Sequence, residues 1–171
     1  MSQGWITAAA SRIKSDSAAG RLTGADVIEA LEGEGEKDVS LLLTRNPEVK
    51  VLPGKTREYF YNRELMNPSY AEMILRVEEK DYPALIRETV EKESRLYPRT
   101  TAVNRFLESP FSVPPDLLPE AVKAVVNDDG NSIEVCKASN GAVHLFASGH
   151  LNRARAEYMA EWEEVGIFES Q

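Results

Sequence analysis

The sequence has one cysteine, Cys136, among its 171 residues. A single thiol excludes an intramolecular disulfide and any zinc cluster built from several cysteines. It favours a reducing compartment, so we expect a cytoplasmic protein. Long apolar runs are also missing, because none approaches the roughly 18 residues that a membrane-spanning helix needs. We therefore expect no membrane partner.

Signatures of catalysis are absent as well. The sequence contains no glycine-rich phosphate loop, no Gly-x-Ser-x-Gly nucleophile turn and no His-Glu-x-x-His zinc pair. We therefore expect a protein that is not an enzyme, with no catalytic residue and no cofactor. One enzymatic alternative stays open, in which a polar cleft between the two halves of the chain holds a buried ionisable group.

Few residues have the chemistry of a metal ligand. The two histidines, His144 and His150, are expected on the surface. We expect His144 opposite Lys137 in a hairpin with Cys136 on the other face, so the two groups would not share a metal ion. A zinc site needs three or four ligands. The acidic run at 32–38 lacks the Asp-x-Asp-x-Asp-Gly spacing of a calcium loop, so we expect no metal.

Positive charge is in short supply. The chain holds 20 Lys and Arg against 28 Asp and Glu, a net charge of -8. Residues 1–85 contribute -3 and residues 86–171 contribute -5. Proteins that bind nucleic acid usually carry a basic face, because neutralising phosphates supplies much of their affinity. The acidic balance therefore favours a protein partner, or self-association, over nucleic acid.

Two hairpin patterns stand out among the features that are present. Apolar runs at 133–137 and 143–147 flank Asn140-Gly141, a pair that favours a two-residue type I′ turn. An earlier pattern at 49–61 has the same order around a Gly-Lys turn. The sequence therefore predicts two β-hairpins of similar length.

The two halves of the chain resemble copies of one unit. Matched residues lie 76 apart near residue 27, and 83 to 86 apart from residue 42 onward. Most of this change in spacing occurs at one proline-rich segment, 109–115, where a single loop insertion explains it. We infer a duplication, with a first unit at residues 1–82 and a second at residues 83–171.

The first unit predicts three helices, a hairpin and a trailing helix. Trp5, Ala9 and Ile13 form the apolar stripe of the first helix, although the same Ala- and Ser-rich segment would also suit a transit peptide. Thr23 is expected to cap a short second helix and Asp38 a third. The hairpin at 49–61 and a trailing helix at 69–80 complete the unit.

The second unit repeats this order. Its first helix is expected over 83–97, and Thr100 or Thr101 is expected to cap a short second helix. Pro114-Pro115 is expected to open the third helix. The apolar face of that helix consists of Leu118, Ala121, Val122 and Val125. The hairpin at 133–147 and a trailing helix at 157–164 follow, and the fold class is α+β, mainly helical.

This order of three helices, hairpin and trailing helix resembles the winged-helix fold, here twice in tandem. The resemblance is to the fold, covers nearly the whole chain and includes no motif of one named family. It implies that each hairpin is a wing. It also implies that the third helix of each unit corresponds to the helix that enters the major groove in DNA-binding members.

The second hairpin needs cover on both sides. A two-residue turn would place Ile133, Val135 and Phe146 on one face and other apolar side chains on the opposite face. The three helices of the unit can cover one face. The trailing helix, the other unit or a second chain must cover the other, which is a physical reason to expect tight packing between the units or self-association.

Two functions are compatible with these patterns. The first is a non-catalytic interaction or adaptor module that docks on another protein, with candidate contacts at Tyr59, Tyr61 and Trp162. The alternative is a DNA-binding transcription regulator that uses the third helix and wing of the first unit. Its candidate contacts are Arg45, Lys50, Lys55 and Arg57.

The second unit is poorly suited to DNA. Its third helix and the flanks of that helix offer a single cation, Lys123, against the acids Asp116, Glu120, Asp128 and Asp129. Phosphate would be repelled there. Any contact with DNA is therefore expected in the first unit.

Overall fold

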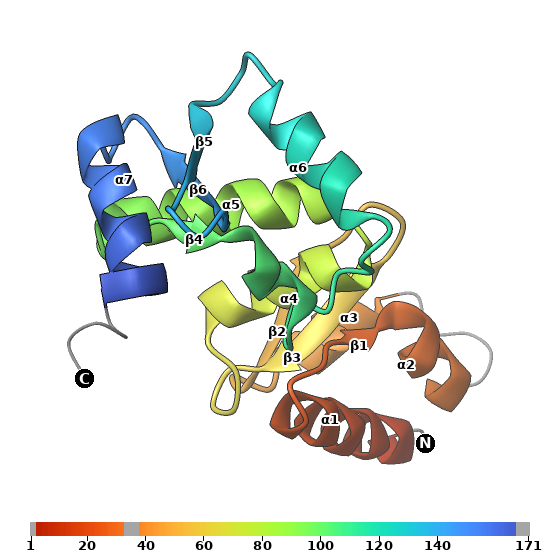
Figure 1. Cartoon of the computed structure of the whole chain (residues 1–171). Helices are drawn as coiled ribbons and strands as arrows, with labels where there is room; N and C mark the ends of the chain where they lie inside the picture. The colour runs from red at the N-terminus through yellow and green to blue at the C-terminus, as the bar shows by residue number, and fades with distance from the viewer. Residues whose placement is uncertain (1–2, 33–37, 167–171) are drawn as a thin grey trace. The chain divides into compact units, whose positions relative to one another are not determined.

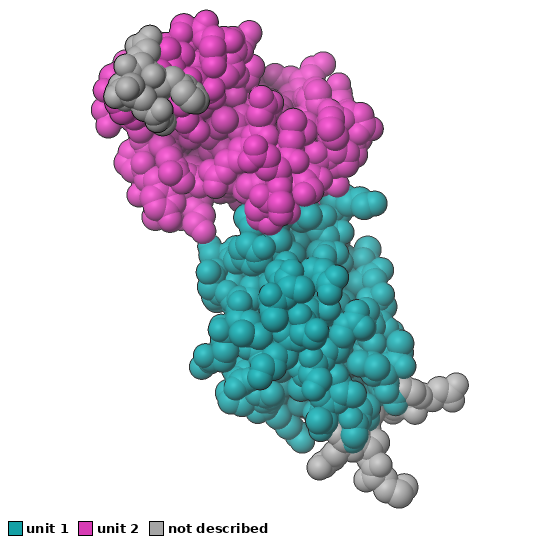
Figure 2. Space-filling view, turned by 60° about the horizontal axis from the view of Figure 1, so that its bottom comes forward, with its two compact units in different colours: residues 1–80 teal, residues 81–171 magenta. Residues whose placement is uncertain are grey.

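The computed structural model describes residues 3–32 and 38–166 (Figure 1). The chain divides into two compact units, Met1–Lys80 and Asp81–Gln171, which are coloured teal and magenta in Figure 2 and are called unit 1 and unit 2 below. The division falls two residues before the boundary expected from the sequence. Part of the acidic run at 32–38 lies outside the described residues.

Unit 1 combines four helices with a small antiparallel sheet in its described residues. Its elements are α1 (Gln3–Ala18), β1 (Thr23–Gly24), α2 (Ala25–Glu32), α3 (Val39–Thr44), β2 (Val49–Pro53), β3 (Glu58–Asn62) and α4 (Pro68–Glu78). The three strands have the order β1-β3-β2, so β3 is central.

Unit 2 has the same order of parts. Its elements are α5 (Tyr82–Leu96), β4 (Thr101–Ala102), the 3-10 helix η1 (Val103–Leu107), α6 (Leu118–Val126), β5 (Ile133–Lys137), β6 (Val143–Ala147), α7 (Arg153–Glu161) and the π-helical turn η2 (Trp162–Gly166). The strand order β4-β6-β5 matches that of unit 1. The expected α+β, mainly helical class is confirmed.

Matched hydrogen bonds recur in the two units. In unit 1 the backbone N–H of Asn62 donates to Ser17 Oγ at 2.9 Å, and in unit 2 the N–H of Ala147 donates to Ser94 Oγ at 3.0 Å. Asn67 and Asn152 both cap the trailing helix with a side-chain oxygen. Phe60 of β3 and Leu145 of β6 occupy corresponding positions, because each is paired with the threonine of the short neighbouring strand.

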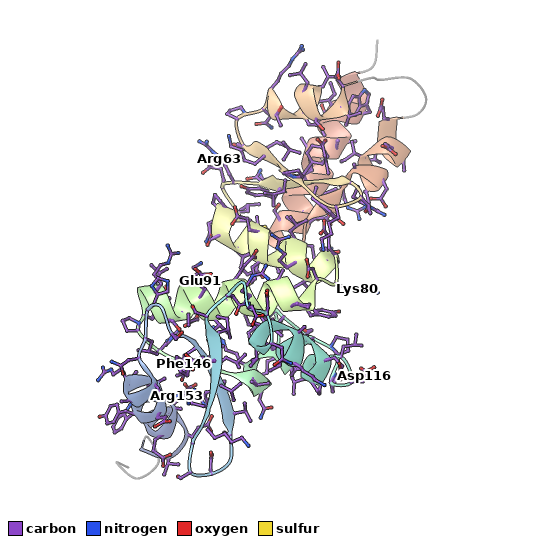
Figure 3. The ribbon with its side chains drawn as sticks, turned by 90° about the horizontal axis from the view of Figure 1, so that it is seen from above. Arg63, Lys80, Glu91, Asp116, Phe146 and Arg153 are labelled. Atoms are coloured by element: carbon purple, nitrogen blue, oxygen red, sulfur yellow. The ribbon has the colours of Figure 1, made fainter. Side chains whose placement is uncertain are left out.

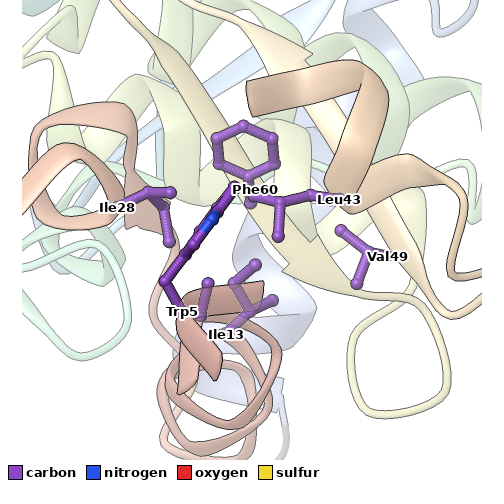
Figure 4. Close-up of a cluster of buried hydrophobic side chains, with 7 residues drawn as sticks. Trp5, Ile13, Ile28, Leu43, Val49 and Phe60 are labelled. Atoms are coloured by element: carbon purple, nitrogen blue, oxygen red, sulfur yellow. The ribbon is translucent and has the colours of Figure 1, made fainter. Parts of the chain in front are cut away.

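The core of unit 1 lies on both faces of its sheet. Trp5 and Ile13 of α1 pack with Ile28, Leu43 and Phe60 on one face (Figure 4), so the expected stripe of the first helix is confirmed. A second cluster on the other face joins the sheet to α4 and contains Leu22, Tyr61, Met66, Ala71, Ile74 and Leu75. The helix α4 therefore covers the face that α1 to α3 leave open.

The second hairpin is covered in the same way. Cys136 and Phe146 pack with Leu151 and with two alanines of α7, Ala156 and Ala160. On the other face, α5 contacts β6 and packs against α6. The trailing helix thus supplies the cover that the hairpin needs, so the hairpin gives no separate reason to expect self-association.

The helix α7 carries charged groups at both ends that contact the hairpin. Arg153 at its start lies 5.4 Å from the ring centre of Phe146, and the two side chains lie close together in Figure 3. The same guanidinium donates to Glu134 at 3.0 Å. At the other end, Glu161 accepts the backbone N–H of Ser139 at 2.7 Å.

The turn of the second hairpin differs from the expected one. Gly141 has a positive φ of 86° and Asn140 does not, so the turn is not type I′. The Gly141 N–H bonds to Ala138 O, and the Ala138 N–H to Ala142 O, which gives a three-residue loop with a bulge at glycine. The extra loop residue shifts the register, so Cys136 and not Lys137 faces His144.

Two further expectations about element starts were wrong. Thr23 and Thr101 do not cap helices, because they form the short strands β1 and β4 and pair with the central strand. The third helix of unit 2 begins at Leu118 and not at Pro114-Pro115, and a different proline, Pro119, lies in its first turn. Asp38 does precede α3, but its side chain makes no capping hydrogen bond.

Across the described residues, every helix is too short or too polar to traverse a lipid bilayer.

Candidate interaction surfaces

The third helix of unit 1 exposes one large apolar side chain. The helix α3 has the sequence VSLLLT and therefore no charged side chain. Leu43 points into the core at 1% exposure, whereas Leu41 is 60% exposed. The helix is short because Asn46-Pro47 follows it, and a residue before proline is disfavoured in helical conformation. Leu41 is therefore the large apolar side chain that α3 offers to a partner.

The third helix of unit 2 presents a mixed surface. Its buried face consists of Leu118, Ala121 and Val125, three of the four apolar positions expected from the sequence. Glu120 and Lys123 are exposed on the other side. Asp116 and Leu117 are exposed just before the helix, in the region where Figure 3 labels Asp116. Acidic and apolar groups therefore outweigh the single cation there.

The four candidate DNA contacts are exposed, but they do not form one face. Lys50 pairs with Tyr61, whose side chain packs toward α4. Arg45 follows α3, which packs on the opposite face of the sheet through Leu43. Lys50 and Arg45 therefore lie on different sides of the hairpin.

The remaining two cations lie among carboxylates. Arg57 pairs with Asp26 at 2.9 Å, and the hydrogen bond and charge of Asp26 raise the pKa of this guanidinium. The backbone N–H of Lys55 donates to Glu79 Oε1 at 2.7 Å. A phosphate at this turn would therefore meet two carboxylates beside the two cations.

The tip of the second hairpin is likewise held by acids of the trailing segment. Glu161 accepts hydrogen bonds from both the N–H and the hydroxyl of Ser139, and these bonds lower the pKa of Glu161. Asn140 donates to Glu164 at 3.2 Å. Each hairpin tip in the described chain is thus fixed by a carboxylate, which disfavours contact with a nucleic-acid backbone.

The three aromatic candidates have different surroundings. Tyr61 is 4% exposed and belongs to the α4 cluster, so it is not available to a partner. Tyr59 is half-buried against the same cluster. Burial raises the pKa of both phenols. Trp162 is 47% exposed and is the one candidate of the three on the surface.

His144 is a core residue, so the expectation of a surface histidine was wrong. It is completely buried, with Thr100 Oγ1 2.9 Å from Nδ1 and Glu164 Oε1 2.6 Å from Nε2. Because the carboxylate accepts, Nε2 carries the proton of this bond, and Nδ1 is hydrogen-bonded to the Thr100 hydroxyl. The hydrogen bond from His144 lowers the pKa of Glu164. The loop length of the hairpin, which sets this register, was the signal that sequence reasoning missed.

His144 and Cys136 face each other across the strands but make no metal site. They share one face of the hairpin, contrary to the expectation. Burial raises the pKa of the Cys136 thiol, which disfavours the thiolate that a metal would bind. In residues 3–32 and 38–166, no group of three potential ligands gathers around a point.

Each unit also contains a buried acid that sequence reasoning missed. In unit 1, Asp16 is 4% exposed and accepts hydrogen bonds from Arg12 at 2.9 Å and from Thr23 at 2.8 Å. Arg21 approaches its other oxygen at 3.3 Å. Both oxygens are bonded, which suits a structural role and not proton transfer.

The counterpart in unit 2 is Glu93, which is 8% exposed. Its two oxygens pair with Arg99 and Arg105, the latter at 3.2 Å. Burial raises the pKa of Glu93, but the hydrogen bonds and charges of the two arginines outweigh it and hold the pKa below the ordinary value of 4.5. The carboxylate therefore joins α5 to Arg99, which precedes β4, and to Arg105 of η1 while it stays ionised.

Glu93→Gln is expected to lower the free energy of unfolding at neutral pH by about 1–3 kcal/mol. Because the pKa of Glu93 is lowered in the folded state, the unfolded state binds more protons as the pH falls below 4.5. The wild type gains this stability fully above pH 4.5 and loses it as the pH falls through the folded pKa. Urea unfolding at a series of pH values gives the free energy of unfolding against pH. Below pH 4.5 this free energy should fall less steeply in the variant than in the wild type. An equally steep fall in the two proteins would contradict this role of Glu93.

Comparison with known protein families gives a match that covers unit 2. A family model described as the YdhW C-terminal domain matches residues 80–168, which is nearly the whole of unit 2. No curated protein and no solved structure matches the chain. Since residues 80–168 are more than half of the 171, the chain belongs to the YdhW C-terminal domain family.

Proposed function

We propose that the chain is a non-catalytic interaction module, built from two winged-helix-like units, that docks on another protein. Three features of each unit support the winged-helix description: the order of helices, the short strand (β1 or β4) that pairs with the hairpin, and the cover on both faces of the hairpin. A cytoplasmic setting is part of the proposal and fits the single free, buried thiol of Cys136. The observation that carries the function is the surface of α3.

The chemistry of α3 fits a protein better than DNA. A helix that enters the major groove is surrounded by phosphates, and Lys and Arg supply most of the affinity there. The helix α3 has no charged side chain and exposes Leu41. The corresponding helix α6 carries one acid, Glu120, and one cation, Lys123, so its charges cancel. Burying an exposed leucine against an apolar surface is worth roughly 1.5–3 kcal/mol, which is the kind of contribution that anchors a protein interface.

A second candidate is a DNA-binding transcription regulator that uses unit 1. The observation in its favour is the exposure of Arg45, Lys50, Lys55 and Arg57 around α3 and the hairpin. Its affinity for duplex DNA would fall steeply between about 50 mM and about 200 mM salt. It would also weaken in a Lys55→Ala/Arg57→Ala variant.

Substitution of Leu41 tests the first candidate. We expect the tagged chain to recover a stoichiometric protein partner from an extract of its source cells, and Leu41→Asp to reduce that recovery at least roughly tenfold. Leu65→Asp is the matched control, because Leu65 is also exposed in unit 1, at 46%. Circular dichroism checks that both variants fold. Salt-sensitive retardation of a DNA duplex without a recovered partner would reverse the choice between the two functions.

A further inference from the structure

Unit 2 exposes three aromatic rings near the C-terminal ends of two helices. Tyr158 and Trp162 lie four residues apart, at the end of α7, and so occupy the same side of the helix. They are 59% and 47% exposed. Tyr97, which caps the end of α5, is 55% exposed. Two exposed aromatic rings on one side of a helix form an apolar patch, which marks a contact surface.

The Trp162 ring is held in place and is not a loose side chain. The turn η2 brings Gly166 against the indole, so closely that a Cβ at residue 166 would lie 2.5 Å from Cε3 of Trp162. The backbone N–H of Trp162 bonds to the carbonyl oxygens of Tyr158 and Met159. One side of the ring therefore rests on backbone while the rest faces water. A fixed ring loses little conformational entropy when a partner binds.

Negative charge surrounds this ring. Between Ala156 and Gln171 the sequence has five glutamates and no lysine or arginine. Glu163 follows Trp162 in the sequence; 50% of its side chain is accessible, and its Oε2 lies 3.9 Å from His144 Nδ1. Glu161 and Glu164 are held ionised by hydrogen bonds from Ser139 and His144, which lower their pKa values. The surroundings of Trp162 therefore attract a cation.

The other two exposed rings of unit 2, Tyr97 and Tyr158, already have cationic partners. Arg99 lies over Tyr97 at 4.8 Å, and Arg155 lies over Tyr158 at 5.6 Å. None of the cation–π contacts within the described residues involves Trp162, although tryptophan has the strongest affinity of the three aromatic rings for a cation. The position for a cation on this indole is thus available to a partner.

We propose that the Trp162 face of α7 and η2 docks a basic segment of the partner protein, with a lysine or arginine side chain stacked on the indole and its charge attracted by the glutamates of this segment. This inference rests on the proposed function. It names the surface of unit 2 that would bind the partner and the chemistry of the segment bound there. A second copy of the chain is a poorer occupant, because unit 2 carries nine basic and fifteen acidic side chains and would be repelled.

A fluorescence titration of the full chain tests this inference. The probe is a capped twelve-residue peptide, three repeats of Lys-Ala-Ala-Arg, and a peptide of Glu-Ala-Ala-Gln repeats is its control. The chain has two tryptophans, and Trp5 is 8% exposed in the core, so Trp162 gives the response to a surface ligand. We expect saturable binding of the basic peptide alone at low salt. Trp162→Ala, followed by anisotropy of a labelled peptide, should weaken it roughly fivefold to thirtyfold.

Charge controls separate a site from general attraction. Glu163→Gln should weaken binding, and Glu120→Gln, which removes the same charge from the exposed side of α6, should not. Absence of binding, equal effects of the two variants, or binding only through self-association would overturn the inference. Recovery of the natural partner that is unaffected by Trp162→Ala but lost in Leu41→Asp would also overturn it, while leaving the proposed function in place. Loss of the proposed function would instead appear as DNA binding without a partner.

Discussion

Phe60→Ala is expected to lower the free energy of unfolding of unit 1 by about 3–5 kcal/mol. Phe60 is completely buried on the central strand and packs with residues of α1, α2, α3 and β2. Truncation removes the ring from a closely packed site and leaves a cavity that Trp5 and Leu43 border within the same cluster. A small domain has about 5–15 kcal/mol of stability in total, so this one change is expected to unfold much of unit 1 under mild denaturation.

The measurement must separate the two units. Native-state hydrogen exchange reports the protection of each backbone amide, so it assigns the loss to unit 1 or to unit 2. The matched variant is Leu145→Ala at the corresponding position of β6, which should cost unit 2 about 2–5 kcal/mol. Leu41→Ala is the surface control and should stay within about 0.5 kcal/mol. Unchanged amide protection in Phe60→Ala would show that the cluster does not hold unit 1 together.

The second large effect is expected from His144→Ala, at about 2–4 kcal/mol. The imidazole is completely buried and bonded at both nitrogens, so its removal creates a cavity and leaves the hydroxyl of Thr100 without its partner. Thr100 is itself 2% exposed and cannot turn to water. Glu164 loses its hydrogen bond from Nε2 as well, which loosens η2 from the hairpin.

The other histidine provides the control for this prediction. His150 is exposed, and its nearest acid, Glu91, lies 4.0 Å away. His150→Ala should therefore change the unfolding free energy by no more than about 0.5 kcal/mol. His144→Gln keeps an N–H that can donate to Glu164 and should recover part of the loss. Equal urea midpoints for the two alanine variants would mean that the buried hydrogen bonds contribute nothing.

Long periodic segments were predictable from the sequence, and short or register-dependent ones were not. The stripe of Trp5, Ala9 and Ile13 follows helical spacing over several turns, so its burial could be predicted. The strands β1 and β4 have two residues each, which is too short for any alternation to appear. Their threonines instead resemble helix caps in sequence.

The candidate sites depended on details finer than periodicity. One extra residue in the loop before Gly141 moved His144 from the position opposite Lys137 to that opposite Cys136, and so from the expected surface into the core. The burial of Tyr61 depends on α4 covering the second face of the sheet, which is a tertiary contact. The exposure of Trp162 came from the alanines of α7 taking the inner positions in place of the aromatic residues.

The charges of α7 run against the dipole of the helix. The positive end of a helix macrodipole is its N-terminus, where α7 has Arg153 and Arg155, and the negative end is its C-terminus, where it has Glu161. Each such placement costs about 0.3–1 kcal/mol in an isolated helix, and nine residues are too few for a stable helix in water. Cut out as a peptide, this segment would be a coil. Its helical form is therefore imposed by the hairpin, so the shape of the Trp162 surface is completed only after β5 and β6 have paired.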